Sequence, residues 1–158
     1  MNKAYLLLGS NIGKREKFLL LASAEIKKRI GIVTISSSLY ETEPWGNNQQ
    51  EKFLNQVLCI KTSLGSKKLL DEILNIEKDF GRKRQKDKWQ PRNIDIDILF
   101  YNDVIINTKS LIVPHPFLHE RRFALVPLAE IDGDFVHPIF KKTIFQLLQE
   151  CKDDKNVS

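Results

Sequence analysis

The sequence predicts an α+β fold, in which helices pack on an antiparallel β-sheet. Three observations support this prediction. Apolar segments with the alternation or β-branching typical of strands flank two segments with helical apolar spacing. Glycine or proline stands at many of the junctions between them. With 158 residues, of which 42% are hydrophobic, the chain is expected to form a single domain, 1–158, around one core.

The first half of the chain predicts a strand, a helix and two further strands. Residues 4–9 form a short apolar run that ends in Gly-Ser-Asn, as a strand before a turn does. Residues 14–30 have apolar side chains at near-helical spacing, and Gly31 stands where a glycine commonly ends a helix. Two segments rich in β-branched or alternating apolar residues follow. They cover 33–42 and 53–62, with a polar loop at 44–52.

The second half predicts a helix, a strand and a C-terminal extension. Residues 67–80 carry an apolar stripe, with Ser66 as the expected N-cap and Gly81 at the end. After a basic loop, residues 94–101 predict a strand and 104–113 a further short one. The extension is expected to hold an amphipathic segment near 118–130, a helix near 143–151 and a frayed tail at 152–158.

This order of elements, β-α-β-β-α-β, is that of the ferredoxin-like fold, an antiparallel sheet with two helices on one face. RNA recognition modules share the order, so an RNA-binding module is the main alternative function. Their pattern of glycine and aromatic residues on the third strand is missing here, and acidic side chains on the sheet would repel an RNA backbone. A catalytically inactive interaction domain is a third alternative.

Two aspartates share one face of the strand predicted at 94–101. Side chains alternate along a strand, so Asp95 and Asp97 project together, with their Cα atoms about 6.6 Å apart. Such a pair suits a hard cation such as Mg²⁺, which prefers oxygen ligands and leaves room for substrate phosphates. The alternative is a solvated strand face, which aspartate disfavours. The pattern therefore predicts a Mg²⁺ site.

A strongly basic loop precedes this strand. Residues 82–92 hold six basic side chains and one aspartate, a net charge of +5, and the whole chain also carries +5. The basic character is therefore local, which indicates a compact anion rather than a nucleic-acid duplex or a membrane. Arg82, Arg84 and Arg92 suit phosphate oxygens, and Trp89 suits a stacked base. The alternative is a flexible, solvated run of charge.

Phe53 and Asn55 predict a binding site for a flat heterocycle. They lie on the same face of the strand at 53–62, where an aromatic ring stands next to an amide that both donates and accepts hydrogen bonds. The alternative is a core phenylalanine and an asparagine that satisfies the backbone.

Other classes of site are not expected. His115 and His119 have i, i+4 spacing, but prolines flank the first and no third ligand is evident, so a phosphate or ribose contact by His115 is favoured over a metal pair. The segment that ends at Lys14 resembles a Walker A phosphate-binding loop but is one residue too short for that motif. Cys59 and Cys151 form no CxxC motif and are expected to be reduced. No apolar run is long enough to span a membrane, so a cytoplasmic location is expected.

Seven motifs extend over nearly the whole chain. They are LLLGSNIG at 6–13, SSLYETEPWG at 37–46, FLNQV at 53–57, IEKDFGRKR at 76–84, WQPRNIDIDIL at 89–99, VPHP at 113–116 and RRFALVPLAEI at 121–131. Together they resemble the 6-hydroxymethyl-7,8-dihydropterin pyrophosphokinase family of folate biosynthesis. The resemblance implies the ferredoxin-like fold and transfer of the terminal pyrophosphate of ATP to the hydroxymethyl group of the pterin, leaving AMP.

The resemblance also implies roles for particular residues. Asp95 and Asp97 would bind two Mg²⁺ ions and, with Arg82 and Arg92 on the phosphates, form the catalytic set. The ATP site would comprise Glu77, Arg84, Trp89, Arg92, Ile98, His115 and Arg121. The pterin would contact Thr42, Glu43, Trp45, Phe53, Asn55, Asp95 and Phe123. A monomer that takes these small molecules, with no nucleic-acid or membrane partner, is expected.

Overall fold

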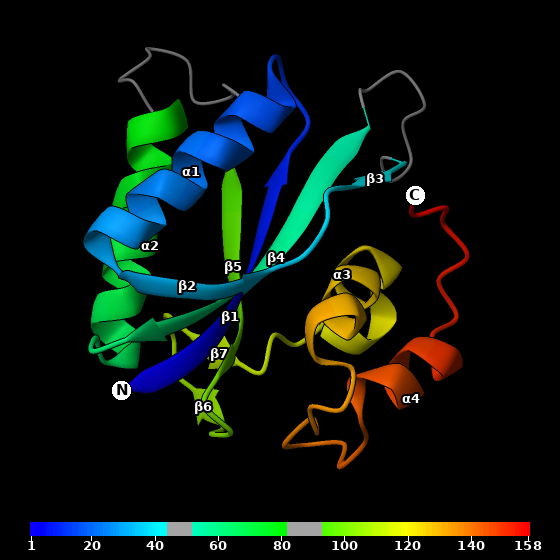
Figure 1. Cartoon of the computed structure of the whole chain (residues 1–158). Helices are drawn as coiled ribbons and strands as arrows, with labels where there is room; N and C mark the ends of the chain where they lie inside the picture. The colour runs from blue at the N-terminus through cyan, green and yellow to red at the C-terminus, as the bar shows by residue number, and fades with distance from the viewer. Residues whose placement is uncertain (44–51, 82–92) are drawn as a thin grey trace.

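The computed structural model describes residues 1–43, 52–81 and 93–158 (Figure 1). The predicted basic loop and nearly all of the predicted polar loop lie outside these residues. The elements up to the acidic strand are β1 (Asn2–Ser10), α1 (Arg15–Arg29), β2 (Gly31–Ser36), β3 (Tyr40–Thr42), β4 (Phe53–Thr62), α2 (Ser66–Gly81) and β5 (Asp95–Tyr101). They are followed by β6 (Ile106–Asn107), β7 (Ile112–Val113), a 3₁₀ turn (Leu118–Glu120), α3 (Arg122–Asp132) and α4 (Ile144–Glu150).

The main sheet is antiparallel throughout, with strand order β2-β4-β1-β5. The short strand β3 pairs with the N-terminal end of β4, and β2 pairs with the C-terminal end. Figure 1 shows α1 and α2 together on one face of this sheet and α3 and α4 on the other. These features confirm the α+β class and the antiparallel sheet. The position of the C-terminal extension was not predicted, and it covers the second face. No helix of the described ranges combines the length and apolar character that crossing a membrane requires.

Alternation along the strands divides the core into two clusters. Leu6 and Leu8 of β1 pack with α1 and α2, whereas Tyr5 and Leu7 pack with α3 and α4. A β-bulge in β5 changes the alternation there, because Leu6 pairs with Ile98 and Tyr5 with Phe100, which leaves Leu99 as the extra residue. As a result Leu99 and Phe100 both pack toward α3 and α4.

The predicted strand at 33–42 is two strands, β2 and β3, so that boundary was wrong. The interruption follows from Ser37. Its backbone N–H donates to the Val57 carbonyl (2.8 Å), but its hydroxyl, not its carbonyl, accepts from the Val57 N–H (2.9 Å). The Ser37 carbonyl accepts instead from the Gln56 side chain (2.9 Å). A side chain therefore replaces the backbone in the ladder, and the regular pairing stops.

Three other boundaries differ from prediction. The helix expected at 67–80 begins at Ser66, which is therefore not its N-cap, because the carbonyl of Gly65 already accepts from the N–H of Leu69 (2.9 Å). The strand expected at 104–113 is the small hairpin of β6 and β7. The amphipathic segment near 118–130 divides into the 3₁₀ turn and α3.

Gly31 directly follows Ile30, the C-cap of α1, as the sequence predicted, and it is also required for strand contact. It begins β2, and a Cβ built on it would lie 2.1 Å from the backbone oxygen of Lys61. We expect Gly31→Ala to lower the free energy of unfolding by about 3 kcal/mol, because β2 must move away from β4. The matched control is Gly65→Ala, where nothing lies within 4 Å of the new methyl group. Urea denaturation of both variants tests this, and equal stability would contradict it.

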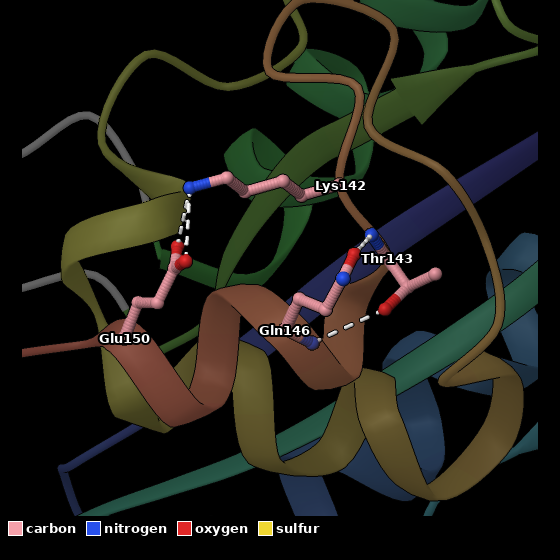
Figure 2. Close-up of polar contacts among 4 residues, drawn as sticks. All are labelled: Lys142, Thr143, Gln146 and Glu150. Atoms are coloured by element: carbon pink, nitrogen blue, oxygen red, sulfur yellow. Dashed lines mark hydrogen bonds and ion pairs between the residues drawn. The ribbon is translucent and has the colours of Figure 1, made fainter.

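The last helix, α4, is stabilised locally (Figure 2). The Thr143 hydroxyl accepts from the Gln146 N–H (3.2 Å), and the Gln146 side chain accepts from the Thr143 N–H (2.8 Å), which makes a capping box. An ion pair between Lys142 and Glu150 (2.8 Å) joins the two ends of the helix. The helix expected near 143–151 is confirmed within one residue at each end.

The tail after α4 is ordered against β3, so the prediction of a frayed end was wrong. Glu41 and Ser158 exchange two backbone hydrogen bonds, of 2.9 and 3.0 Å, and Thr42 and Val157 form a β-bridge. Figure 1 shows this segment leaving α4 and ending beside β3.

His137, in the loop between α3 and α4, makes stability depend on pH. It is 1% exposed, and its Nδ1 accepts from the backbone N–H groups of Ile139 and Phe140. Burial and the nearby His119 lower its pKa to about 4. Below about pH 6.5 the unfolded chain binds a proton here that the folded chain does not bind until about pH 4. Stability should therefore fall as the pH falls through this window.

We expect this histidine to account for up to about 3 kcal/mol of stability lost between pH 7 and pH 4. His137→Asn keeps an acceptor for the two N–H groups but does not titrate. Denaturation at a series of pH values should show a smaller loss in the variant than in the wild type. Identical pH profiles would contradict the assignment.

Candidate active site

Two cavities meet at Asp95 and Asp97. The face cavity, of about 230 Å³, lies on the side of the sheet that carries α3. The edge cavity, of about 570 Å³, lies along the outer edge of β5, beside α2. Both aspartates line both cavities. A ligand in either cavity therefore has access to the same two carboxylates.

Strand alternation places this acidic pair as predicted. Ile94, Ile96 and Ile98 are buried in the core with α1 and α2. Asp97 is half-buried and Asp95 is exposed, and both belong to the opposite face of the strand. The pair is thus open to a ligand while its strand is anchored in the core.

Gly9 opens the floor of the face cavity. It lies between Asn55 of β4 and Asp95 of β5 in the sheet register. A Cβ at Gly9 would lie 2.8 Å from the side-chain oxygen of Asn55. The missing side chain therefore leaves room between the amide and the carboxylate. The sequence showed this glycine only as part of a turn, and neither it nor Leu7, which also lines the cavity, was predicted as a site residue.

The face cavity gathers the residues predicted to bind the pterin. Its lining comprises Leu7, Gly9, Thr42, Glu43, Phe53, Asn55, Asp95, Asp97, Arg121 and Phe123. Asn55 and Thr42 are buried, and the Asn55 side chain donates to the Thr42 hydroxyl (3.2 Å). This bond fixes the amide at the wall of the cavity. Trp45, the remaining predicted contact, lies outside the described residues.

Arg121 lines the face cavity, although the resemblance grouped it with the ATP residues. Its guanidinium lies over the rings of Phe117 (5.3 Å) and Phe123 (5.6 Å). These stacked contacts orient a positive charge beside the acidic pair. An anion bound at the junction of the two cavities would lie within the field of this arginine.

Glu77 closes the open edge of β5. Among the strands that the structure describes, β5 pairs with β1 alone, so its other edge leaves backbone N–H groups without a strand partner. The Glu77 carboxylate, 6% exposed, accepts from the N–H of Ile96 (2.9 Å). The edge cavity is thus lined by a buried carboxylate that holds the backbone of β5.

His115 faces the acidic pair from the edge cavity. Its Nδ1 accepts from the backbone N–H of Phe117 (3.2 Å). Burial lowers the pKa of His115, Asp97 raises it and Arg121 lowers it, and the net shift is downward. The ring is therefore neutral near pH 7. With Nδ1 as an acceptor, the neutral ring carries its proton on Nε2, which is available to donate to an anionic ligand.

The edge cavity brings together five predicted residues, which are Glu77, Asp95, Asp97, Ile98 and His115. It also includes Lys109, a cation that no sequence pattern singled out. The other predicted residues, Arg82, Arg84, Trp89 and Arg92, lie outside the described ranges. Across residues 1–43, 52–81 and 93–158, no three His, Cys, Asp or Glu side chains form a metal-binding group.

Comparisons with known proteins agree on one family. The family model of 7,8-dihydro-6-hydroxymethylpterin-pyrophosphokinase (HPPK) matches residues 5–133. A 2-amino-4-hydroxy-6-hydroxymethyldihydropteridine pyrophosphokinase of Aquifex aeolicus is 46% identical over 150 residues, which cover 95% of this chain and 92% of the relative. The relative of the same name from Bacillus subtilis is 49% identical over 131 residues, which cover 82% of this chain and 78% of the relative.

Solved structures show the same fold. A Plasmodium falciparum HPPK-DHPS triple mutant superposes with a TM-score of 0.78 at 19% identity, over 94% of this chain and 44% of that chain. An HPPK-DHPS solved in complex with substrates gives a TM-score of 0.75 at 16% identity, over 94% of this chain and 43% of that one. This chain thus spans less than half of these solved chains. Because the family model covers most of the sequence and both relatives match along most of their length, the chain belongs to the 7,8-dihydro-6-hydroxymethylpterin-pyrophosphokinase family.

Proposed function

We propose that this chain transfers pyrophosphate from ATP to 6-hydroxymethyl-7,8-dihydropterin in folate biosynthesis, giving AMP and the pterin diphosphate. Family membership and the names of the relatives support the reaction. The observation that carries the proposal is the junction of two cavities at one acidic pair. A two-substrate transfer needs such a junction, and the RNA-binding alternative does not.

The strand order supports a ferredoxin-like sandwich. The units β1-α1-β2 and β4-α2-β5 interleave so that β1 lies between β4 and β5, and all neighbours are antiparallel. This is the arrangement expected for the split βαβ fold. We further propose that residues 1–158 act as one domain with an added C-terminal extension, as a monomer in the cytoplasm, without nucleic-acid or membrane partners.

The pterin is assigned to the face cavity. Phe53 and Phe123 supply aromatic surfaces for a flat bicyclic ring, and both line this cavity. Asn55, fixed by Thr42, presents both a donor and an acceptor to the edge of the ring. Glu43 and Trp45 complete the proposed pterin site, with Asp95 near the hydroxymethyl group.

ATP is assigned to the edge cavity. Ile98 presents backbone groups, and His115 supplies a donor for the ribose or the phosphates. The phosphate chain then runs toward the acidic pair and Arg121. Glu77 fixes the edge of β5 against which the nucleotide packs. The loop that carries Arg82, Arg84, Trp89 and Arg92 immediately precedes this strand in sequence, so we assign these residues to the ATP site as well.

The acidic pair fits two Mg²⁺ ions. Its carboxylates project to one side of β5, at the junction of the cavities. Two carboxylates are a typical protein share of an Mg²⁺ site, where waters and substrate phosphates supply the other oxygen ligands. When bound, the ions would neutralise phosphate charge and orient the pyrophosphate group.

The side chains of this protein are proposed to position the two substrates and to stabilise the negative charge of the phosphates. The pterin hydroxyl attacks the β-phosphorus of ATP in line, the bond to the α-phosphate oxygen breaks, and AMP departs. Holding one substrate in each cavity brings the two reacting groups together at the junction. Arg82, Arg92 and Arg121 are proposed to stabilise the negative charge that spreads over the phosphates. No general base is assigned.

An AMP-release assay tests the proposed function. The protein is incubated with ATP, Mg²⁺ and 6-hydroxymethyl-7,8-dihydropterin, and the phosphorus-31 NMR spectrum is followed. We expect AMP and a pterin diphosphate in equal amounts, each dependent on the pterin. Formation of ADP with a pterin monophosphate, or no turnover at all, would contradict the proposal.

A further inference from the structure

The helix α3 begins at the face cavity without a local cap. Its N-cap residue is Arg121, whose side chain makes no capping hydrogen bond. That side chain lies instead over the rings of Phe117 and Phe123 and lines the cavity. Arg121, whose side chain lines the cavity, therefore occupies the N-cap position, at which Ser, Thr, Asp or Asn usually stabilises a helix.

Asp153, from the C-terminal tail, supplies the missing cap. Its Oδ2 accepts from the backbone N–H of Arg122, the first residue of α3, at 3.1 Å. Its Oδ1 accepts from the N–H of Lys155 at 3.0 Å, which holds the carboxylate in place. A carboxylate at a helix N-terminus both accepts an otherwise unpaired N–H and is favoured by the helix dipole.

The same tail also holds the opposite wall of the face cavity. Beyond Lys155 it pairs with β3 through the two backbone bonds between Glu41 and Ser158. Thr42 follows Glu41, forms the bridge to Val157 and accepts the hydrogen bond of Asn55. One short segment thus contacts both the start of α3 and the strand that orients Asn55, and Figure 1 shows it ending beside β3.

We infer that the tail, residues 152–158, positions both walls of the face cavity, with Asp153 as a positioning residue that acts through Arg121 and Phe123. The inference rests on the proposed function for its substrates. Without the Asp153 cap the first turn of α3 opens part of the time, and substrate then binds only to the fraction of molecules in which the turn is closed. Apparent affinity falls in proportion to that fraction.

The first test compares three single variants. Asp153→Ala removes the cap, and Asp153→Asn retains an acceptor oxygen. Asp154→Ala removes the neighbouring exposed carboxylate, which makes no hydrogen bond or ion pair with residues 1–43, 52–81 or 93–158. For Asp153→Ala we expect KM to rise by up to about fivefold for both the pterin and ATP, the limit set by one lost helix cap, with a smaller change in kcat. Asp153→Asn should restore most of the affinity, and Asp154→Ala should behave as the wild type.

The second test deletes Val157 and Ser158. This removes the pairing with β3 but leaves the Asp153 cap, so we expect KM to rise for the pterin alone. Amide hydrogen exchange at Phe123 and Ala124 provides a readout independent of activity. It should be faster in Asp153→Ala and unchanged in the deletion.

These outcomes separate the tail from the proposed function. If Asp153→Ala lowers the melting temperature but leaves both KM values and the exchange rates at Phe123 and Ala124 unchanged, the residue is merely structural and the inference falls. If the wild type releases no AMP from ATP and pterin, the proposed function falls instead. The role of Asp153 in holding α3 is then still decided by the exchange rates, where no difference between Asp153→Ala and Asp154→Ala would overturn it.

Discussion

Replacing Asp97 by alanine is expected to reduce kcat about a thousandfold or more, with the fold retained. The carboxylate lines both cavities, so its loss would remove a proposed Mg²⁺ ligand at the junction to which the two substrates are assigned. An ion that polarises a transferring phosphoryl group supplies several kcal/mol to the transition state, which corresponds to this change in rate. The side chain is half-buried and projects away from the core isoleucines of β5, so folding should depend on it little.

Initial rates of AMP release across a range of Mg²⁺ concentrations check this prediction. The matched control is Asp103→Ala, which removes an exposed carboxylate in the turn after β5 and should leave the rate unchanged. The melting temperatures of the two variants should agree within a few degrees. Near-normal turnover by Asp97→Ala would refute the assignment of this pair to the metal.

Asn55→Leu is expected to lower kcat/KM for the pterin about a hundredfold and to leave the KM for ATP unchanged. Leucine has the same branching and the same number of heavy atoms as asparagine but can neither donate nor accept hydrogen bonds. Two lost hydrogen bonds at a buried site cost about 3 kcal/mol, which gives this ratio. The ATP constant should not change, because Asn55 lines the face cavity and is not part of the lining of the edge cavity.

Steady-state kinetics with each substrate varied in turn measure the two constants. The same variant leaves the buried Thr42 hydroxyl without the Asn55 donor, so a modest fall in stability is also expected. Thermal unfolding separates that effect from binding. An equal rise in both KM values would show that Asn55 maintains the structure of both cavities, and would contradict its assignment to the pterin.

Local periodicity was sufficient to predict the acidic pair and its strand. Period-two alternation holds in the regular part of β5, before the bulge at Leu99, so Asp95 and Asp97 share a face. The same reasoning predicted Phe53 and Asn55 together, and β4 has the predicted bounds, Phe53–Thr62. The family motifs added the identity of the substrates, which spacing alone does not contain.

Contacts between distant segments could not be predicted in this way. Asp153 and Arg122 are 31 residues apart, and nothing in the local sequence of either indicates the contact. Gly9 is a site residue only because the sheet register places it between Asn55 and Asp95. The second role of Gly31, in strand contact, was not predicted because it depends on how closely the backbone of Lys61 approaches. In each case the missing information was a tertiary contact between segments that are distant in sequence.

The most direct test of the account is a crystal structure with Mg²⁺, a non-hydrolysable ATP analogue and the pterin. We predict ions about 2.1 Å from carboxylate oxygens of Asp95 and Asp97, with phosphate oxygens completing their coordination. The adenosine should occupy the edge cavity and the pterin ring the face cavity. Absence of any ion at both carboxylates, or binding of the two substrates away from their shared junction, would contradict the account.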